Sequence, residues 1–508
     1  MRLMIAGGGG FRVPLVYRAL CSGPYAGLVR ELVLFDLDPG RLAAISAVLR
    51  SMARSMGQGS SEAGSLETGS APDGSAAVGQ PPVVTATTSL PEALTGTDVV
   101  FAAIRPGGTA GRIADERVAQ DLGLLGQETT GAGGISYALR SIPAMLELAR
   151  EMRTHCPDAW LVNFTNPAGM ITEALLPVLG RKVIGICDSA SALVHRAARA
   201  AGFPLPAGKL DGVGYYGLNH LGWLYRLESG GRDRLPDLLG DAGALAGFEE
   251  GRLFPQAFLQ ELGVLPNEYL FYYYETARAA AAMRGMDSTR GESIHGQQSE
   301  LYPRLAAAGD AAFELWEAAR RSREEGYLAE ARAGGEARDA GDLAGGGYEQ
   351  VALAVMRALT TPGLAGSGDA GAGEAGDGTQ LILNTQNTAV SGPGGSEGGG
   401  EGGSEPAIPG LPADAVVEVP CTVTSTGAEP IPQARPAEPQ LSLMQHVKRV
   451  ELLTVRAASL GDRGAALEAF AEHPLVGSEE LAGQLLAGYE AAFPELGRLW
   501  QGSGTGSR

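Results

Sequence analysis

Leu3-Met4-Ile5-Ala6-Gly7-Gly8-Gly9-Gly10 is a short apolar run that ends in four consecutive glycines. Apolar residues at helical spacing follow from Val13 to Leu20, so this stretch predicts a strand, a tight turn and a helix in that order. Glycines allow the turn to close and let its amides approach a pyrophosphate, whose charge the helix N-terminus favours. We therefore expect Gly7, Gly8, Gly9 and Gly10 to bind a dinucleotide in the first βα unit of a Rossmann-type domain.

A second predicted strand, Leu32-Val33-Leu34-Phe35, ends at Asp36. An acidic residue at this position bonds the adenosine ribose hydroxyls and favours NAD over NADP. The alternative is that the glycines only make a turn and that Asp36 only caps the next helix. Two further predicted strands, 98–104 and 159–164, end at Arg105 and at Thr165-Asn166-Pro167, and we expect both ends to face the cofactor crevice. For Arg105 alone, a surface ion pair explains the residue equally well.

Composition limits the class of protein. The chain has 508 residues, enough for two domains, and a formal net charge of -19. Nucleic acid and anionic membranes require clusters of Lys and Arg, so we expect neither as a partner. No long apolar segment and no signal-like N-terminus is present, which favours a cytoplasmic protein. The four cysteines are too sparse for a disulfide framework, which leaves Cys187 available for chemistry.

Two stretches, about 55–80 and about 363–403, are rich in Gly, Ser and other small residues. Such composition does not offset the entropy of ordering, so we expect both to be disordered insertions. Apolar and β-branched residues return at 415–420, which indicates that the second insertion interrupts a domain. We expect a dinucleotide-binding domain at 1–186 and a second domain at 187–508.

Two short segments carry metal-binding side chains, Gly185-Ile186-Cys187-Asp188 and Gly217-Leu218-Asn219-His220. A thiolate and an imidazole make a plausible pair of ligands for a transition metal. Taken singly, Cys187 is better explained as a small buried apolar residue at a strand end, and His220 as a structural histidine.

Several motifs together resemble glycoside hydrolase family 4, the NAD- and metal-dependent glycosidases, and most closely its 6-phospho-β-glucosidase branch. The matching segments lie in order along the chain: Gly126-Gln127-Glu128-Thr129-Thr130-Gly131, Asn163-Phe164-Thr165-Asn166-Pro167-Ala168-Gly169, the Cys187 and His220 segments, Tyr269-Leu270-Phe271-Tyr272-Tyr273-Tyr274, 407–419 and His473-Pro474-Leu475-Val476. The resemblance covers nearly the whole chain outside the two expected insertions.

The resemblance implies an α/β fold of the lactate and malate dehydrogenase type, with an N-terminal Rossmann-type NAD-binding domain followed by an α+β catalytic and oligomerisation domain. It also implies a homodimer or homotetramer. The implied cofactors are NAD and Mn2+, with Cys187 and His220 as the metal ligands. Because these ligands are softer than the oxygens that manganese prefers, ligand type alone leaves zinc, nickel, cobalt and iron(II) open.

The resemblance also implies roles for individual residues. Tyr269 is the best match to the base that removes the C2 proton of the sugar, with Tyr272 and Tyr273 as weaker candidates. Arg290 would supply a nearby positive charge or hold the substrate. Arg105, Glu128 and Asn166 would contact the substrate, although Glu128 has a capping role as its alternative. Asp188 resembles the proton donor of 6-phospho-α-glucosidases, whereas β-specific members often carry asparagine there.

The predicted function is hydrolysis of 6-phospho-β-glucosides, such as cellobiose 6-phosphate or an aryl glucoside, to glucose 6-phosphate. Oxidation at C3 makes the C2 proton acidic, the leaving group is eliminated, water adds and the ketone is reduced again. The alternatives within the family are 6-phospho-α-glucosides, nonphosphorylated glucosides and galacturonides. Outside it, the alternatives are an NAD-dependent 2-hydroxyacid dehydrogenase and a noncatalytic protein that binds NAD or a sugar phosphate.

Overall fold

The computed structural model describes residues 1–62, 80–325, 347–361, 378–389 and 405–501. The chain forms two compact units, and each is built from three segments of sequence. Unit 1 consists of Met1–Ile104, Arg150–Val162 and Ser293–Tyr327, and unit 2 of Arg105–Ala149, Asn163–Glu292 and Leu328–Arg508. These units differ from the expected single boundary after residue 186, because helices far along the chain complete the N-terminal unit.

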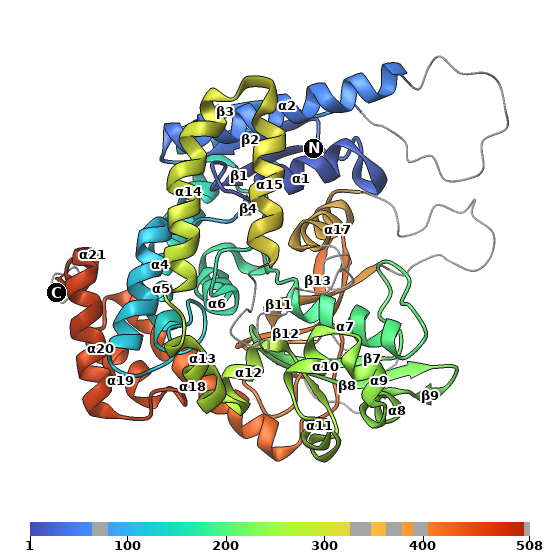
Figure 1. Ribbon diagram of the computed structural model, residues 1–508, viewed down its shortest axis with the longest axis vertical. Coiled ribbons are helices and arrows are strands. Elements are labelled where there is room, and N and C mark those ends of the chain that lie inside the picture. The colour runs from blue at the N-terminus through green and yellow to red at the C-terminus, as the bar shows by residue number, and fades with distance from the viewer. Residues whose placement is uncertain (63–79, 326–346, 362–377, 390–404, 502–508) are drawn as a thin grey trace, which may run out of the picture. The chain divides into compact units, whose positions relative to one another are not determined.

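Unit 1 is a Rossmann-type arrangement around a parallel sheet (Figure 1). The strand order is β5-β4-β1-β2-β3, with β1 paired in parallel to both β2 and β4. The strands are β1 (Arg2–Ala6), β2 (Glu31–Phe35), β3 (Val83–Thr87), β4 (Val99–Ala102) and β5 (Trp160–Asn163), whose last residue belongs to unit 2. The predicted strands at 3–6, 32–36, 98–104 and 159–164 are therefore confirmed to within two residues.

The central strands β1, β2 and β4 are short, apolar and largely buried, because parallel strands are covered by helices on either side, whereas the edge strand β3 is largely exposed. Helices of unit 1 are α1 (Val13–Cys21), η1 (Gly23–Tyr25), α2 (Pro39–Glu62), α3 (Leu90–Leu94), η5 (Gly309–Ala311), α15 (Ala312–Glu325), the end of α5 (Ala132–His155) and most of α14 (Arg290–Ala307). Two late side chains bond the glycine turn region: Tyr302 Oη donates to Gly9 O at 2.8 Å, and Trp316 Nε1 to Phe11 O at 2.8 Å.

Unit 2 contains an antiparallel sheet of order β10-β8-β7-β12-β11-β6, with β9 beside β8 and β13 beside β12. Its strands are β6 (Val183–Gly185), β7 (Val213–Leu218), β8 (Leu221–Ser229), β9 (Arg232–Asp233), β10 (Leu265–Pro266), β11 (Thr379–Gln386), β12 (Val416–Thr424) and β13 (Gly427–Pro430). Helix α6 (Ala168–Leu179) packs against β6, β11 and β12, and α17 (Tyr348–Thr360) against β11 and β12.

The remaining elements of unit 2 are helical (Figure 1). They are α4 (Gly108–Asp121), the rest of α5, η3 (Gly180–Lys182), α7 (Ser189–Ala200), α8 (Leu235–Gly240), α9 (Ala242–Ala246), α10 (Glu249–Leu253), α11 (Gln256–Leu262), η4 (Glu268–Leu270), α12 (Phe271–Tyr274), α13 (Thr276–Arg284), α18 (Glu438–Leu460), α19 (Arg463–Glu472), α20 (Glu479–Ala492) and α21 (Pro494–Gln501). Among the described residues, no helix combines the length and apolarity needed to cross a bilayer. The expected combination of a Rossmann-type N-terminal half with an α+β remainder is confirmed.

The prediction of one continuous insertion at 363–403 is wrong at its centre. Strand β11 lies there and pairs with β12 along its whole length, from Thr379 opposite Val423 to Gln386 opposite Val416. Glycine-rich flanks on both sides dominated the composition and hid eight residues of good strand propensity. The first expected insertion also starts too early, because α2 continues to Glu62. The other parts of both expected insertions lie outside the described residues.

Candidate functional site

The glycine turn after β1 is held by the end of β2. The amides of Gly7 and Gly8 both donate to Phe35 O, at 2.9 and 2.7 Å. Gly7 has φ +89°, and a Cβ there would lie 2.5 Å from Ala103 O, while a Cβ on Gly8 would lie 2.7 Å from Leu34 Cα. Only glycine fits these two positions. The glycines therefore let the turn pack closely against the ends of β2 and β4 immediately before α1, which is the tight turn that a dinucleotide site requires.

Asp36 contributes to the same turn. Its Oδ2 accepts a hydrogen bond from Gly9 N at 3.0 Å, and its Oδ1 accepts one from Asp38 N at 3.1 Å. A carboxylate oxygen has more than one acceptor site, so these bonds leave room for a ribose hydroxyl. Asp36 therefore orders the turn directly, a role that neither of the two sequence interpretations included.

Arg105 and Glu128 form an ion pair in unit 2. Arg105 Nη1 lies 2.6 Å from Glu128 Oε2, and Arg112 Nη1 lies 2.7 Å from Glu128 Oε1. Burial acts to lower the pKa of Arg105, but the charges of Glu128, Tyr137 and Asp115 and the hydrogen bond to Glu128 together outweigh it and raise that pKa above its ordinary value. Arg105 and Glu128 therefore lie together, and Glu128 holds two arginines.

Asn166 follows β5 and precedes a cis peptide bond to Pro167. Its amide Nδ2 donates to Phe164 O at 3.4 Å. Its Oδ1 is buried and has no hydrogen-bond partner among the described residues. A buried acceptor without a partner is costly unless a ligand supplies the donor, so this oxygen fits a hydroxyl group of a bound sugar.

Cys187 is a buried free thiol between β6 and α7. Burial raises the pKa of Cys187 well above the ordinary thiol value, and the negative charges of Glu418 and Asp188 raise it further. Hydrogen bonds from the backbone and side chain of Ser189, in the first turn of α7, act in the opposite direction. A bound cation would favour the thiolate, which is the form that binds metals. Asp188 makes no side-chain cap to α7, so its carboxylate is not used to start the helix.

His220 lies in the tight turn between β7 and β8 and has a left-handed backbone, with φ +64°. It is buried, and burial lowers the pKa of His220 to about 3, although the charge of Glu128 opposes the shift. The imidazole is therefore neutral near pH 7. Its Nδ1 is buried without a hydrogen-bond partner among the described residues. A neutral ring with an unused nitrogen is the form that binds a metal ion.

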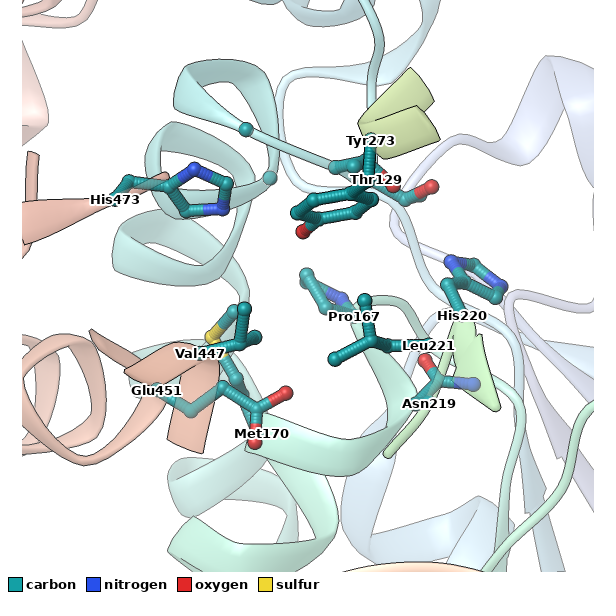
Figure 2. A pocket seen from close by; sticks show the side chains of 13 residues that line it. Thr129, Pro167, Met170, Asn219, His220, Leu221, Tyr273, Val447, Glu451 and His473 are labelled. Carbon is teal, nitrogen blue, oxygen red and sulfur yellow. The ribbon is translucent and has the colours of Figure 1, made fainter. Parts of the chain in front are cut away.

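Tyr269 stacks on this imidazole, with ring centroids 3.7 Å apart and an interplanar angle of 6°. Tyr273, four residues later on α12, instead lines a cavity beside His220, and Figure 2 shows its hydroxyl directed into that space. His473 and Glu451 lie on the opposite wall from His220. The full lining is Thr129, Thr130, Gly131, Gly134, Pro167, Met170, Asn219, His220, Leu221, Tyr273, Val447, Glu451 and His473. The aromatic run therefore presents two tyrosines, not one, to the His220 region.

Arg290 is the first residue of α14. The next amide, Gly291 N, donates to Glu116 Oε2 at 2.7 Å, and Glu116 Oε1 pairs with Arg112 Nε at 2.7 Å. Because Arg112 also binds Glu128, the start of α14 is tied to the ion-pair group that includes Arg105. This places Arg290 beside a group of substrate-binding candidates.

The fit to a divalent metal depends on the donors present. Within the described ranges, no three His, Cys, Asp or Glu side chains are grouped as metal ligands. Cys187 and His220 therefore provide at most two protein ligands, which leaves positions open to substrate and water, as in a catalytic rather than a structural site. The buried Nδ1 of His220 fits such a metal.

Glu418 was missed by sequence reasoning. Its side chain is fully buried in β12 and accepts hydrogen bonds from Tyr215, Asn219 and Asn384. The signal was present in the sequence, because Glu418 interrupts the apolar stretch from Val416 to Val419. A charged residue inside a strand that is otherwise apolar must have buried partners. Asn384 was missed with it, since it lies in the strand that was predicted to be an insertion.

Comparison with known proteins gives a consistent result. Residues 72–202 match the model of family 4 glycosyl hydrolases, and residues 215–476 match the model of their C-terminal domain. The chain is 29% identical over 404 residues to a probable 6-phospho-β-glucosidase of Bacillus subtilis, with 78% of each chain covered. It is 31% identical over 287 residues to 6-phospho-α-glucosidase 1 of Lacticaseibacillus paracasei, covering 53% of this chain and 59% of that protein.

A solved structure is also similar over almost its whole length. It is the 6-phospho-β-glucosidase of Thermotoga maritima with manganese, NAD+ and glucose 6-phosphate. The sequence identity is 25%, the TM-score is 0.71, and the alignment covers 98% of this chain and 99% of the other.

Glu268 generates a prediction for stability. It is buried beside Arg196 and Glu250, whose Nε and Oε2 are 3.0 Å apart. Burial and the charge of Glu250 raise the pKa of Glu268 to about 8, against the pull of Arg196. The folded state thus holds this proton more tightly than the unfolded state, so the stabilisation is complete at low pH and is lost as pH rises from about 4.5 to about 8.

We expect Glu268→Gln to reduce the pH dependence of unfolding. The wild-type free energy of unfolding should fall between pH 5 and pH 8 with a contribution from Glu268 of up to about 1.4 kcal/mol per pH unit. Urea denaturation across this range measures the slope, with the exposed Glu480→Gln as the matched control. Equal slopes for wild type and Glu268→Gln would show that Glu268 is not protonated in the folded state.

Proposed function

The chain belongs to glycosyl hydrolase family 4, and from this premise we propose that it hydrolyses 6-phospho-β-glucosides with NAD and a divalent metal ion as cofactors. It is a glycoside hydrolase, and the net reaction releases glucose 6-phosphate and an alcohol or a sugar. The observation that carries the proposal is the state of His220: neutral, buried, left-handed and with Nδ1 unused among the described residues.

The β preference is supported by the motif resemblance and by similarity to the Bacillus subtilis and Thermotoga maritima proteins. The second candidate is a 6-phospho-α-glucosidase. It is favoured by Asp188, whose carboxylate follows the metal-binding cysteine and is not used to cap α7. Elimination from either anomer passes through the same intermediate, so the position of the leaving group and its proton donor decides between them.

Both cofactors supply chemistry that side chains lack. Bound NAD supplies the oxidation of the C3 hydroxyl to a ketone and the reduction that reverses it at the end of the turnover. A divalent metal held by Cys187 and His220 supplies Lewis-acid stabilisation of negative charge on the sugar oxygens. The pyrophosphate binds to the backbone of the glycine turn, Gly7, Gly8, Gly9 and Gly10. Asp36 accepts a hydrogen bond from a ribose hydroxyl and also orders the turn.

Substrate binding falls to groups in unit 2. The Oδ1 of Asn166, which has no partner among the described residues, accepts a hydrogen bond from a hydroxyl of the sugar. Arg105 provides positive charge for the phosphorylated sugar, and Glu128 fixes its guanidinium in place. Arg290, at the start of α14, adds a second positive charge beside this group.

Proton transfer needs a base at C2 and an acid at the leaving oxygen. We assign the base to Tyr269, which stacks on His220 and so lies next to the proposed metal ion. A phenol ordinarily has a pKa near 10, and an adjacent cation lowers it toward neutrality. Tyr273 is the competing candidate because its hydroxyl faces the cavity that His220 lines. Asp188 is the proton donor.

The substrate assignment is tested with p-nitrophenyl 6-phospho-β-glucoside. We expect release of p-nitrophenol only when both NAD and Mn2+ are present, because oxidation at C3 and charge stabilisation are both required. The α-anomer and the unphosphorylated glucoside are the comparison substrates. Turnover of the α-anomer alone would replace the β assignment by the α assignment, and turnover of none would contradict the proposed function.

The metal assignment is tested with Cys187→Ser and His220→Ala. Each removes one of two protein ligands, so we expect Mn2+ affinity to fall by more than about 100-fold, beyond the usual effect of a residue that only supports a ligand. NAD affinity, measured by fluorescence titration, should stay within about two-fold. Cys421→Ser is the matched control, because Cys421 is also a buried free thiol in unit 2. Equal loss of NAD and Mn2+ binding would contradict the separation of the two sites.

The base is identified by Tyr269→Phe and Tyr273→Phe. Loss of the base should slow exchange of the C2 proton with deuterated solvent by about 10²- to 10⁴-fold, while affinity for glucose 6-phosphate is retained. We expect this result for Tyr269→Phe and near-normal exchange for Tyr273→Phe. The reverse pattern would move the base to Tyr273.

A further inference from the structure

The backbone of His220 is held in an unfavourable conformation. A left-handed φ of +64° costs a residue with a side chain on the order of 1 kcal/mol relative to the ordinary regions. Such a conformation persists only where the surroundings determine it. Stacking on Tyr269 fixes the ring plane, but it does not fix the turn itself. The pairing of Leu218 with Leu221 closes the hairpin around this turn, and side-chain bonds of Asn219 add to that constraint.

Asn219, the residue before His220, forms a hydrogen bond through each polar atom of its side-chain amide. Its Oδ1 accepts a hydrogen bond from Ala168 N, the first residue of α6, at 3.0 Å. Its Nδ2 donates to Glu418 Oε1 at 3.4 Å. These two bonds set the orientation of the turn between β7 and β8, in which His220 is the next residue.

Glu418 is connected to the segment before Cys187 through Asn384. Its Oε1 accepts from Asn384 Nδ2 at 3.1 Å, and its Oε2 accepts from Tyr215 Oη at 2.9 Å. Asn384 pairs with Gly185, where a Cβ would lie 2.8 Å from the Cβ of Asn384. The network around Glu418 thus spans the two segments that carry the proposed metal ligands.

We propose that Glu418 is a positioning residue that holds His220 in its metal-binding orientation through Asn219. The two oxygens of Glu418 accept from three donors, and within the described ranges Glu418 does not join Cys187 and His220 in a group of three metal-binding side chains, so it acts as a support for the ligands. Groups that orient metal ligands commonly change metal affinity by about 10- to 100-fold when removed. The inference rests on the proposed function, because it takes His220 as a ligand.

Replacing Glu418 by glutamine distinguishes a positioning role from a role of its negative charge, because glutamine keeps the hydrogen bonds and removes the charge. In Glu418→Gln the amide oxygen can still accept from Asn219 and Asn384, and the hydroxyl of Tyr215 can turn to accept from the new NH2 group. Glu418→Ala removes every one of these bonds. We therefore expect Mn2+ affinity within about three-fold of wild type in Glu418→Gln and a loss of about 10- to 100-fold in Glu418→Ala.

The measurement is Mn2+ binding by electron paramagnetic resonance on the full chain with NAD present, together with NAD affinity and thermal unfolding. Asn387→Ala is the matched control, because Asn387 is equally buried and bonds only the loop around Ile408 and Leu411 among the partners described. It should lower stability without changing Mn2+ affinity. If Glu418→Ala does not fold, Asn219→Ala replaces it, since Glu418 then keeps Tyr215 and Asn384 and the same loss of Mn2+ affinity is expected.

Normal Mn2+ binding in Glu418→Ala, or in Asn219→Ala where Glu418→Ala does not fold, overturns the inference and leaves the proposed function intact. A loss in Glu418→Gln as large as that in Glu418→Ala overturns it in favour of a role for the charge. A wild-type chain that does not bind Mn2+, or binds it equally after His220→Ala, overturns the proposed metal site and this inference together.

Discussion

A carboxylate buried in the middle of a sheet must be satisfied by donors from its neighbours, and in unit 2 that constraint falls on Glu418. Tyr215, Asn219 and Asn384 supply the donors, from β7, the turn after it and β11. These bonds link the register of β7, β11 and β12 to the position of the turn that contains Asn219. An apolar residue in β12 would satisfy the core equally well, but Asn219 Nδ2 would then lose this acceptor.

Burial acts in opposite ways on the two side chains that we propose as metal ligands. It keeps the imidazole of His220 neutral, so no proton has to leave before a metal binds. It keeps the thiol of Cys187 protonated, so metal binding there releases a proton. His220 is already in the neutral form that binds a metal, whereas Cys187 reaches its thiolate form only when a cation binds. A site of this kind discriminates against weakly held ions, because the ion must displace a proton to complete its coordination.

The sequence was sufficient for the parallel half of the fold and insufficient for the sheet of unit 2. Short apolar strands that end in glycine or in Asp36 are local patterns, and the helix that starts at Val13 follows directly from them. Strand β11 was not predicted, because the glycine-rich composition of the surrounding stretch outweighed the short apolar run Leu381-Ile382-Leu383. The contribution of residues 293–327 to unit 1 depends on contacts across about 300 positions of sequence, such as that of Tyr302 with Gly9. No local pattern encodes such a contact. For the site, residue types and motifs named Cys187 and His220, whereas the hydrogen bonds that link the segments around them involve Asn384 and Glu418, on strands much later in the chain.

The interleaving of the two units has a consequence for inheritance and engineering. The glycine turn receives bonds from Tyr302 and Trp316, which lie beyond most of unit 2 in the sequence. A gene fragment that ends after residue 186 therefore encodes the parallel strands without α14, η5 and α15. The nucleotide-binding half cannot be exchanged for another by a single crossover in the gene. A single crossover anywhere between residues 105 and 292 would divide both units at once.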